Sequence, residues 1–518
     1  MTLKAIPAVL LGCLVLFGCS SQSDSRQAGS DDTDPTAQAG TSTAWLDAKN
    51  KCAGEQPCFT EPQQAIDAVS GQPEATVNVL AGTYTIPETA KPATEPGLTI
   101  DAPVTLQGWD SDDCQEKNSC PTIEFLGQTT TGLRVKANDV TIENLAFVQQ
   151  EVPPSTPGGQ LIEVPQPDPG TVFDDVFINE VVIDGGRRGL RASGQDLTVT
   201  NSVFTGQAAD AILIPTITGS SAFQGNYFEG TGTSKKAINF EEQYQSLPAS
   251  GDVFVEYNTT KGKNNLMSWN IWPQQAGGKV NLSVVHNTVV SSGGPMVAFW
   301  ASSNPDAFGL FSAIAIDSNL FTEGGGTPVL VDYTDAGKSG AVPANSLIDV
   351  SNNLTYQNKE KSGVTADKTG VAGFGFTPDV PADASMKMFN VKDTVTGAPK
   401  VGAAPDYALQ GGSAALGAGE SGSNIGAWQG AAPVVRAVVP RCLPAGRTVN
   451  IFGKNIQGAT TVLFGGVASP QIELSGNKIK AVVPDSTTTG LVDVTVTTDK
   501  GSATLRNGFR YPSPDSGC

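Results

Sequence analysis

Basic residues in the middle of the chain offer the clearest candidate chemistry. They occupy related positions: Arg134 and Arg191 in the phrases GLRV and GLRA, Arg187 and Arg188 just before the second phrase, and Lys236 before AINF. Such cations neutralise the carboxylates of an acidic substrate, and one with a lowered pKa can abstract a proton beside a carboxylate. Arg134, Arg191 and Lys236 are the candidates for that catalytic role, and Arg187 and Arg188 for binding. The alternative is ordinary solvated charge on a strand face.

Carboxylates in the same region allow a different reaction. Five follow short apolar stretches: Asp184, Asp210, Glu229, Glu241 and Glu242. Two carboxylates about 5 Å apart, or about 6.5–9.5 Å apart, fit retaining or inverting hydrolysis of a glycosidic bond. The sequence supplies no distance, and exposed acidic residues are expected in a chain with a formal net charge of −19.

Tryptophans form the third candidate group. Trp269, Trp272 and Trp300 lie close together in the sequence, and Trp272 falls in an inserted stretch with Asn270 and Pro273. Aromatic faces stack on sugar rings when one side of the ring remains exposed. The three tryptophans are therefore candidates for substrate binding, with packing in the core as the alternative.

Several mechanisms are disfavoured by composition. His286 is the single histidine, which removes every mechanism that needs two. Asp174 and Asp175 form a pair, but the Asn-Thr-Asp strand and Gly-His-Gly turn of polygalacturonases are not found beside it. The net charge of −19 argues against nucleic acid as a partner. No cofactor is expected; calcium binding stays an open alternative that the sequence does not show.

These residues lie in a region where one short phrase recurs. The third residue of each copy serves as a marker: Ile142, Ile178, Val199, Phe223, Val255, Val284, Ile316 and Val350. Successive markers are 21 to 36 residues apart, a period typical of a solenoid. Apolar and polar residues alternate inside each phrase, as in half-buried strands, and a second strand follows most copies. The pattern predicts an all-β, right-handed parallel β-helix.

Stacked turns would line up equivalent residues. Five copies place Asn three residues after the marker, at Asn226, Asn258, Asn287, Asn319 and Asn353, so the fold predicts one column of hydrogen-bonded amides. If Leu133 and Leu190 point inward, Arg134 and Arg191 point outward on one sheet. Neighbouring rungs lie roughly 5 Å apart, which would bring the basic residues into a groove for an acidic sugar.

The start and end of the solenoid carry a resemblance. The phrase AIDAV…VNVLAGTY (65–84) and the closing run DYALQ…GSAALGAG…NIGAW (406–428) resemble those of carbohydrate-associated β-helix proteins of the pectate-lyase-like superfamily. The resemblance implies a polysaccharide partner. It leaves open whether the chain only binds the glycan, cleaves it as a polysaccharide lyase or glycoside hydrolase, or serves as a structural or adhesive surface protein.

A different pattern begins near residue 431. Short alternating strands recur at 449–455, 462–466, 478–484, 493–497 and 509–511, which predicts a small β-sandwich. The motifs "V.FGG" and "VDVTVTT" resemble an IPT/TIG domain, an immunoglobulin-like module. The resemblance implies a spacer or binding unit without catalytic residues of its own.

The N-terminus resembles a bacterial lipoprotein leader. An apolar run ends in Leu16-Phe17-Gly18-Cys19-Ser20, which resembles a lipobox and implies cleavage before Cys19 and lipid attachment there. By that resemblance the chain is anchored in a lipid bilayer of the cell envelope, at the outer membrane if the organism has one. We therefore expect a signal peptide at 1–18, a flexible tether at 19–43, the β-helix at 44–430 and the IPT/TIG domain at 431–518.

Six further cysteines fall into three pairs. The expected disulfides are Cys52–Cys58, Cys114–Cys120 and Cys442–Cys518, because an even number in an exported chain indicates cross-links. A four-cysteine metal site built from the first two pairs is the alternative. Five residues separate the cysteines of each of these pairs instead of two, which favours disulfides.

Overall fold

The computed structural model describes most of the chain from residue 41 onward. The described residues are 41–88, 95–109, 120–126, 131–149, 159–168, 170–230, 236–241, 249–263, 265–271, 279–300, 307–324, 328–332, 348–356, 365–366, 374–376, 389–393, 395, 397–405, 407–475 and 478–512. Cys19 and the rest of the expected leader and tether up to residue 40 lie outside them. Among the described residues, no helix is long and apolar enough to span a membrane.

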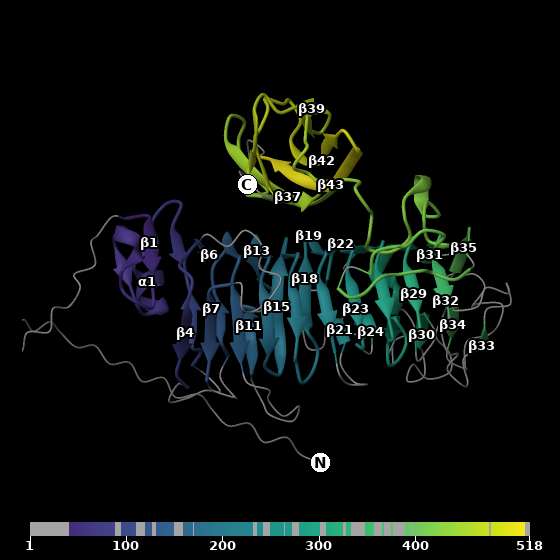
Figure 1. Cartoon of the computed structure of the whole chain (residues 1–518), viewed down its shortest axis with the longest axis horizontal. Helices are drawn as coiled ribbons and strands as arrows, with labels where there is room; N and C mark the ends of the chain where they lie inside the picture. Colours follow the sequence, from purple (N-terminus) through teal and green to yellow (C-terminus); the bar gives the residue numbers. More distant parts are fainter. Residues whose placement is uncertain are drawn as a thin grey trace, which may run out of the picture. The chain divides into compact units, whose positions relative to one another are not determined.

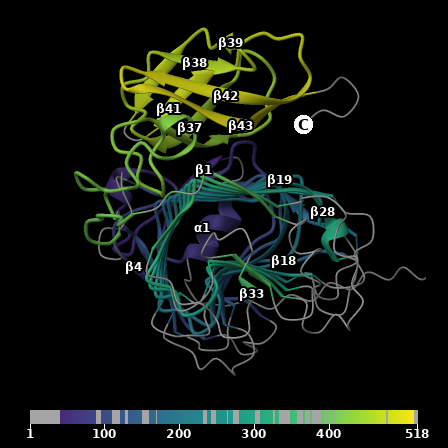
Figure 2. The same cartoon turned by 90° about the vertical axis from the view of Figure 1, so that its right-hand side faces the viewer.

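The larger part of the described chain is a parallel β-helix, which confirms the predicted fold (Figure 1). Each turn adds one strand to each of three parallel sheets, A, B and C. Figure 2 looks along the solenoid and shows the sheets around a common interior. The eight predicted markers pair with one another in register along sheet A.

Within the described residues the strands of each sheet follow one another along the solenoid. Sheet A contains β2 (Cys58–Phe59), β1 (Thr43–Leu46), β3 (Thr76–Val79), β6 (Val104–Gly108), β9 (Val140–Glu143), β13 (Val176–Asn179), β16 (Thr198–Thr200), β19 (Ser220–Gln224), β22 (Gly251–Glu256), β25 (Val280–Val285), β28 (Phe311–Asp317), β31 (Ile348–Ser351) and β35 (Phe389–Lys392). Sheet B contains β4 (Thr83–Ile86), β7 (Thr122–Phe125), β10 (Ala146–Gln149), β14 (Val182–Gly185), β17 (Val203–Thr205), β20 (Tyr227–Glu229), β23 (Thr259–Lys261), β26 (Thr288–Val290), β29 (Leu320–Thr322) and β32 (Leu354–Tyr356). Sheet C contains β5 (Leu98–Ile100), β8 (Leu133–Val135), β11 (Gln160–Val164), β15 (Arg188–Gln195), β18 (Ile212–Thr218), β21 (Lys236–Glu241), β24 (Asn265–Asn270), β27 (Val297–Trp300), β30 (Val329–Asp332), β34 (Phe374–Phe376) and β33 (Thr365–Ala366), and β12 (Phe173–Asp174) pairs with β15.

One strand of sheet C lies in a proline-rich stretch. The prolines of residues 152–169 favour irregular structure over a strand, yet Gln160–Val164 within this stretch forms β11. All five of its residues are buried, and it pairs in parallel with β8 and β15. Pairing on both sides satisfies its backbone groups, so tertiary context determines this strand and overrides the surrounding prolines.

The predicted asparagine column is confirmed. Backbone N and side-chain Nδ2 of Asn258 both donate to Oδ1 of Asn287, at 2.9 and 3.1 Å, and the pattern repeats from Asn226 to Asn353. The residue before each column member has a positive φ, as at Tyr257 (54°). The column therefore satisfies the backbone at the sharp turn between sheets A and B, where strand pairing is interrupted.

The N-terminal end of the solenoid is closed by a helix. Helix α1 (Pro62–Val69) buries Ala65, Ile66 and Val69, as its amphipathic pattern predicts, and packs against the first strands. The short helix η1 (Cys52–Gly54) precedes it, and the predicted Cys52–Cys58 disulfide is confirmed. Cys120 and Cys442 are also disulfide-bonded, whereas their expected partners Cys114 and Cys518 lie outside the described residues.

After the last turns, the chain returns along the outside of sheet B. Leu409, Ala415 and Ile425 pack on Leu320 and Leu354. Two further short helices lie in the described chain, η3 (Ala307–Leu310) and η4 (Glu420–Gly422). Residues 409–425 are called the return segment below. This segment covers apolar residues of sheet B and brings the chain to the start of the next domain.

The C-terminal domain is a sandwich of two antiparallel sheets, called the C-terminal sandwich below. One sheet contains β36 (Val434–Val439), β37 (Thr448–Lys454), β41 (Lys478–Val482) and β40 (Ile472–Ser475). The other contains β39 (Val467–Ala468), β38 (Thr461–Phe464), β42 (Gly490–Thr498) and β43 (Gly501–Tyr511). Its own core includes Ile451, Phe464 and Phe509, while Phe452 and Ala437 pack against Phe177 of sheet A.

The asparagine column yields a stability prediction. Asn287→Ala leaves the amide groups of Asn258 without their acceptor, and the carbonyl of Val255 without its side-chain donor. Because these groups are buried, we expect the free energy of unfolding to fall by about 2–4 kcal/mol. Urea denaturation followed by circular dichroism measures this change. Asn281→Ala, on the exposed face of the preceding strand β25, is the control; equal effects of the two substitutions would contradict the prediction.

Candidate functional site

A strip of polar residues runs along the outer face of sheet C. In this sheet Leu133, Ile162 and Leu190 are paired across successive rungs and are fully buried, so the residues that follow them face outward. These outward residues are Arg134, Glu163, Arg191, Leu213, Asn239, Ser268 and Ala298. Arg134 and Arg191 therefore lie on one sheet, where the sequence places them.

Glu163 lies between these two arginines. Its Oε2 is 2.8 Å from Nε of Arg134, and its Oε1 is 3.2 Å from Nη1 of Arg191. The Arg191 side chain keeps 32% of its surface exposed, against 17% for Arg134. The three residues form a cation–anion–cation row with one net positive charge.

A second row marks the edge where the chain enters sheet C. Arg188 and Lys236 begin β15 and β21, and Asp210 occupies the corresponding position just before β18. The carboxylate of Asp210 accepts a hydrogen bond from the backbone N of Lys236 at 3.4 Å. Each of the three residues precedes an outward residue by three positions, so this row runs beside the first one.

Asn239 connects the two rows. Its Oδ1 accepts from Nζ of Lys236 at 3.1 Å and from Nδ2 of Asn270 at 3.3 Å. Its Nδ2 donates to Asp210 at 2.9 Å and to Glu241 at 3.4 Å. One buried amide thus fixes a lysine and two carboxylates on the outer face of the sheet, although only 3% of Asn239 is exposed.

Burial changes the acid–base properties of this cluster. Loss of solvent lowers the pKa of Lys236 below its ordinary value, and the nearby charges of Asp210 and Glu241 oppose the shift. Burial also lowers the pKa of Arg188, helped by the charge of Arg187. A lysine with a lowered pKa is more often neutral near neutral pH and can therefore act as a base.

A pocket of about 420 Å³ lies at the N-terminal end of the strip. Its lining includes Arg134, Lys136, Glu163 and Phe173. Basic side chains and an aromatic ring thus surround a cavity beside the first row.

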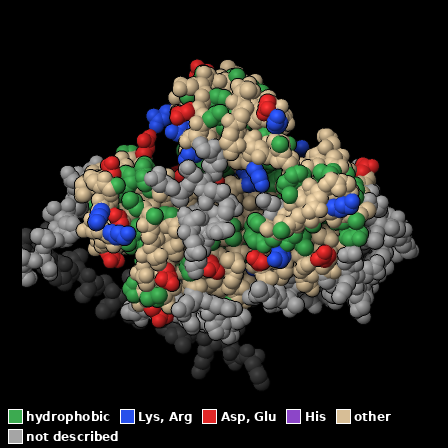
Figure 3. All heavy atoms as spheres, viewed as in Figure 1, with side chains coloured by type: hydrophobic (Ala, Val, Ile, Leu, Met, Phe, Trp, Pro, Cys, Tyr) green, Lys and Arg blue, Asp and Glu red, His purple; other side chains and the backbone are tan. Residues whose placement is uncertain are grey.

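On the face of the molecule drawn in Figure 3, charged side chains of both signs lie in small groups, so the negative charge of the chain is not concentrated in one patch there.

The three tryptophans lie in different environments. Trp300 faces outward at the end of β27, is partly exposed, and donates from Nε1 to Oγ of Ser268 at 2.8 Å. The prediction that Trp269 binds substrate is wrong: it is fully buried and stacks on Phe240 at 4.2 Å, because its position alternates with outward Ser268. Trp272 lies outside the described residues.

The acidic candidates for hydrolysis separate. Asp210 and Glu241 meet at Asn239, whereas Asp184 and Glu229 lie on sheet B, where Glu229 pairs with Lys261 at 3.2 Å. Glu242 lies outside the described residues. Of the four candidates that the structure describes, the fold therefore brings together two, Asp210 and Glu241.

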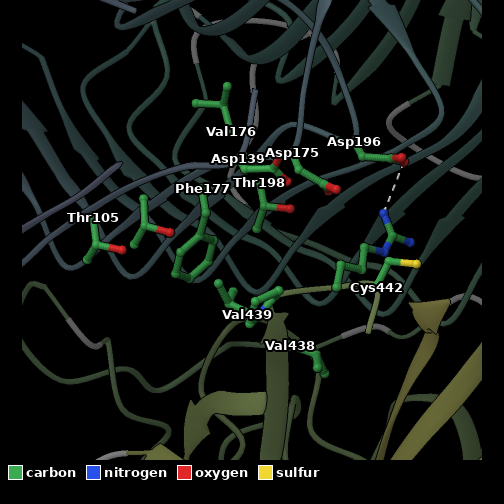
Figure 4. Close-up of a pocket in the computed structure, with 13 residues that line it drawn as sticks. Thr105, Asp139, Asp175, Val176, Phe177, Asp196, Thr198, Val438, Val439 and Cys442 are labelled. Atoms are coloured by element: carbon green, nitrogen blue, oxygen red, sulfur yellow. Dashed lines mark hydrogen bonds and ion pairs between the residues drawn. The ribbon is translucent and has the colours of Figure 1, made fainter. Parts of the chain in front are cut away.

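Another acidic group lies between sheet A and the C-terminal sandwich. Within the described residues, the oxygens of Asp174, Asp175 and Asp196 lie within 4.8 Å of one another, near enough to share a metal ion. Arg441 and Arg510 already approach Asp196, at 3.1 and 3.5 Å. A cavity here is lined by Asp139, Asp175 and Asp196 on one side and by Val438 and Val439 on the other (Figure 4). Guanidinium groups supply positive charge to this cluster.

His286 has a structural environment. It follows β25 in a turn, with φ of 55°. Only 8% of the residue is exposed, its ring stacks on Tyr257, and Nδ1 lies 3.1 Å from the carbonyl oxygen of Asn424. Burial lowers its pKa. The return segment therefore covers this side chain.

Sequence reasoning missed three residues that organise the site. Glu163 lies in a stretch that the prolines make look irregular, and Asn239 occurs in a strand that reads as apolar. Asn270 ends strand β24, although its sequence context predicts an inserted stretch. A signal for Asn239 exists in its position: it follows inward Ile238 as Arg191 follows inward Leu190. Aligning the second strands of all turns would have placed it in the outward strip.

Comparisons with known proteins identify one domain. Residues 433–511 match the IPT/TIG domain family, so the C-terminal sandwich is a TIG domain. No curated protein matches the chain.

Three solved structures match this chain with low sequence identity and low TM-scores. The A-module of the Azotobacter vinelandii mannuronan C-5 epimerase AlgE6 is 14% identical, with 65% of this chain and 94% of that chain covered and a TM-score of 0.36. Pectate lyase Pel9A is 14% identical, with 76% and 98% covered and a TM-score of 0.38. A pectin methylesterase from Aspergillus niger is 12% identical, with 67% and 94% covered and a TM-score of 0.27. Because these similarities are low, function has to be inferred from the side chains of this chain.

Proposed function

We propose that the outer face of sheet C binds an acidic polysaccharide. The observation that carries the proposal is the row in which Arg134 and Arg191 flank Glu163 on consecutive rungs. Arginine presents several donors in a plane that matches a carboxylate, and both arginines keep part of their surface exposed.

The length of the strip also supports a polymeric ligand. The cluster around Asn239 continues the face across the next rungs, and Trp300 adds an aromatic surface near its far end. Strands in a sheet lie about 4.8 Å apart, so these groups extend over several sugar units. A linear glycan laid across the strands would contact the exposed parts of Arg191, Asn270 and Trp300 in turn. Asn239, which is 3% exposed, would act by holding Lys236 in place.

Replacement of Arg191 tests the binding proposal. We expect Arg191→Ala to weaken binding of polygalacturonate or polymannuronate about 10- to 100-fold, because a hydrogen bond to a charged group contributes about 1.5–3 kcal/mol. Arg191→Lys should restore part of the affinity, since it keeps the charge but loses the planar donor pair. Isothermal titration calorimetry with each polymer, and with neutral dextran, measures the effect.

Lys261→Ala provides the matched control. Lys261 forms a similar ion pair with Glu229 at 3.2 Å, but on sheet B. Its loss should leave binding unchanged, and thermal unfolding should show that all variants remain folded. Failure of the wild-type chain to bind either polyuronate, or unchanged affinity in Arg191→Ala, would refute the proposal.

A second candidate function, β-elimination of the bound uronan, is favoured by Lys236. Its pKa is lowered by burial, and Asn239 holds its Nζ on the same face as the two arginines. The neutral amine could take the proton beside the uronate carboxylate, while an arginine stabilises the charge that develops there. The electron pair of the C–H bond forms the double bond and the C4–O bond breaks. Its electron pair stays on the oxygen of the leaving glycan, which takes a proton from water.

The elimination reaction has its own test. We expect turnover to increase with pH as Lys236 loses its proton, with an apparent pKa below the ordinary lysine value. Lys236→Ala should abolish the ultraviolet absorbance of unsaturated uronate while binding persists, and Lys261→Ala should behave as wild type. If Lys236→Ala still releases unsaturated product, Lys236 is not the base. If the wild-type chain releases no product, the chain binds the uronan without cleaving it.

We also propose that the chain is anchored to an envelope membrane through Cys19. The support is the lipobox-like run that ends at Cys19 and Ser20, followed by a polar stretch suited to a tether. On expression in a bacterium, the wild-type chain should partition into detergent and carry lipid at Cys19 by mass spectrometry. Cys19→Ala should remain in the aqueous phase; identical partitioning of both chains would exclude the anchor.

A further inference from the structure

Opposite charges face each other where the C-terminal sandwich meets sheet A. Four basic residues of the sandwich approach acidic groups of the solenoid: Lys478 toward Glu143, Arg441 and Arg510 toward Asp196, and Arg506 toward Glu256. Asn507 adds a hydrogen bond to Asp252 at 3.0 Å, and Phe452 packs on Phe177 at 5.3 Å. The contact therefore combines a small apolar centre with several charged pairs.

One part of this contact has more negative than positive charge. A cavity of about 170 Å³ is lined by Asp139, Asp175 and Asp196 from the solenoid and by Arg441 from the sandwich. Asp174 adjoins it, and its Oδ2 accepts from Nε2 of Gln195 at 3.0 Å. Four carboxylates thus meet two guanidinium groups, those of Arg441 and Arg510. The sandwich covers part of this acidic group: Asp196 is buried, Asp174 and Asp175 are half-buried, and Asp139 remains exposed.

We propose that the C-terminal sandwich is a pH-sensitive latch on sheet A. Protonation of Asp174 and Asp175 removes the surplus negative charge, so the docked arrangement tightens in mildly acidic solution. Loss of those protons restores repulsion within the cavity and loosens the sandwich. The ion pairs of Asp196 with Arg441 and Arg510 remain as the attractive part of the contact at neutral pH.

The acid–base properties of the cavity agree with this geometry. Burial, and then the charge of Asp196, raises the pKa of Asp174 to about 6. Burial, and then the charge of Asp174, raises the pKa of Asp175 to about 7. Asp139 adds repulsion at both groups, while Arg510 and Arg441 oppose the respective shifts.

The sign of the pH effect follows from linkage. The docked state binds protons more tightly than an undocked state in which water reaches both carboxylates. Docking is therefore favoured below the raised pKa values and weakens as pH rises through them.

Hydrogen–deuterium exchange of the full chain tests the latch. We expect peptides that contain β13, β16 and residues 437–442 to lose about tenfold protection between pH 6 and pH 8.5, after correction for the intrinsic exchange rate. Peptides from β24 and β27 of sheet C serve as the internal reference and should keep their protection. Equal loss in these peptides would indicate general unfolding and would contradict the proposal.

Substitutions that remove the charge of a cavity carboxylate distinguish the latch from other causes of lost protection. Asp175→Asn resembles the protonated side chain, so its interface peptides should stay protected at pH 8.5, and Asp174→Asn should show a smaller effect in the same direction. Asp101→Asn, an exposed change between β5 and β6, should behave as wild type. Constant protection in the wild-type chain, or a full pH-dependent loss in both cavity variants, would overturn the proposal.

Discussion

The stacking of one turn on the next is the constraint on which the rest of this structure depends. Parallel pairing fixes each rung against its neighbours, and the asparagine column from Asn226 to Asn353 fixes the sharp turn between sheets A and B. Register and alternation then determine which side chains face outward. A residue in one turn lies beside the equivalent residue of the next turn, so residues far apart in the sequence form rows on one face.

The outward residues of sheet C are only partly exposed or buried, and this loss of solvent changes their acid–base properties. Asn239 and Ser268 face away from the core, yet 3% and 0% of them are exposed. In this environment Lys236 keeps one fixed hydrogen bond and loses solvent, which lowers its pKa. Arg191, nearer the N-terminal end of the strip, remains a third exposed. The same sheet thus presents a surface suited to carboxylate binding next to an amine suited to proton transfer.

Sequence patterns predicted the features that depend on periodicity. Alternation places Arg134 and Arg191 on one face, and the repeated Asn three residues after each marker predicts the column. Features that depend on three-dimensional context could not be predicted from these patterns. Glu163 lies in a strand that forms because neighbours pair on both sides of it, and Trp269 points inward because of a register that its letters alone do not show. The charge balance beneath the C-terminal sandwich involves residues from separate domains, so no local motif encodes it.

The location of a bound uronic-acid oligomer would test the central claim most directly. A crystal structure of the chain with oligogalacturonate or oligomannuronate should show the sugar along the outer face of sheet C, with a carboxylate within hydrogen-bonding distance of Arg134 or Arg191. Sugar bound to sheet B or to the C-terminal sandwich, with the sheet C face empty, would contradict the account.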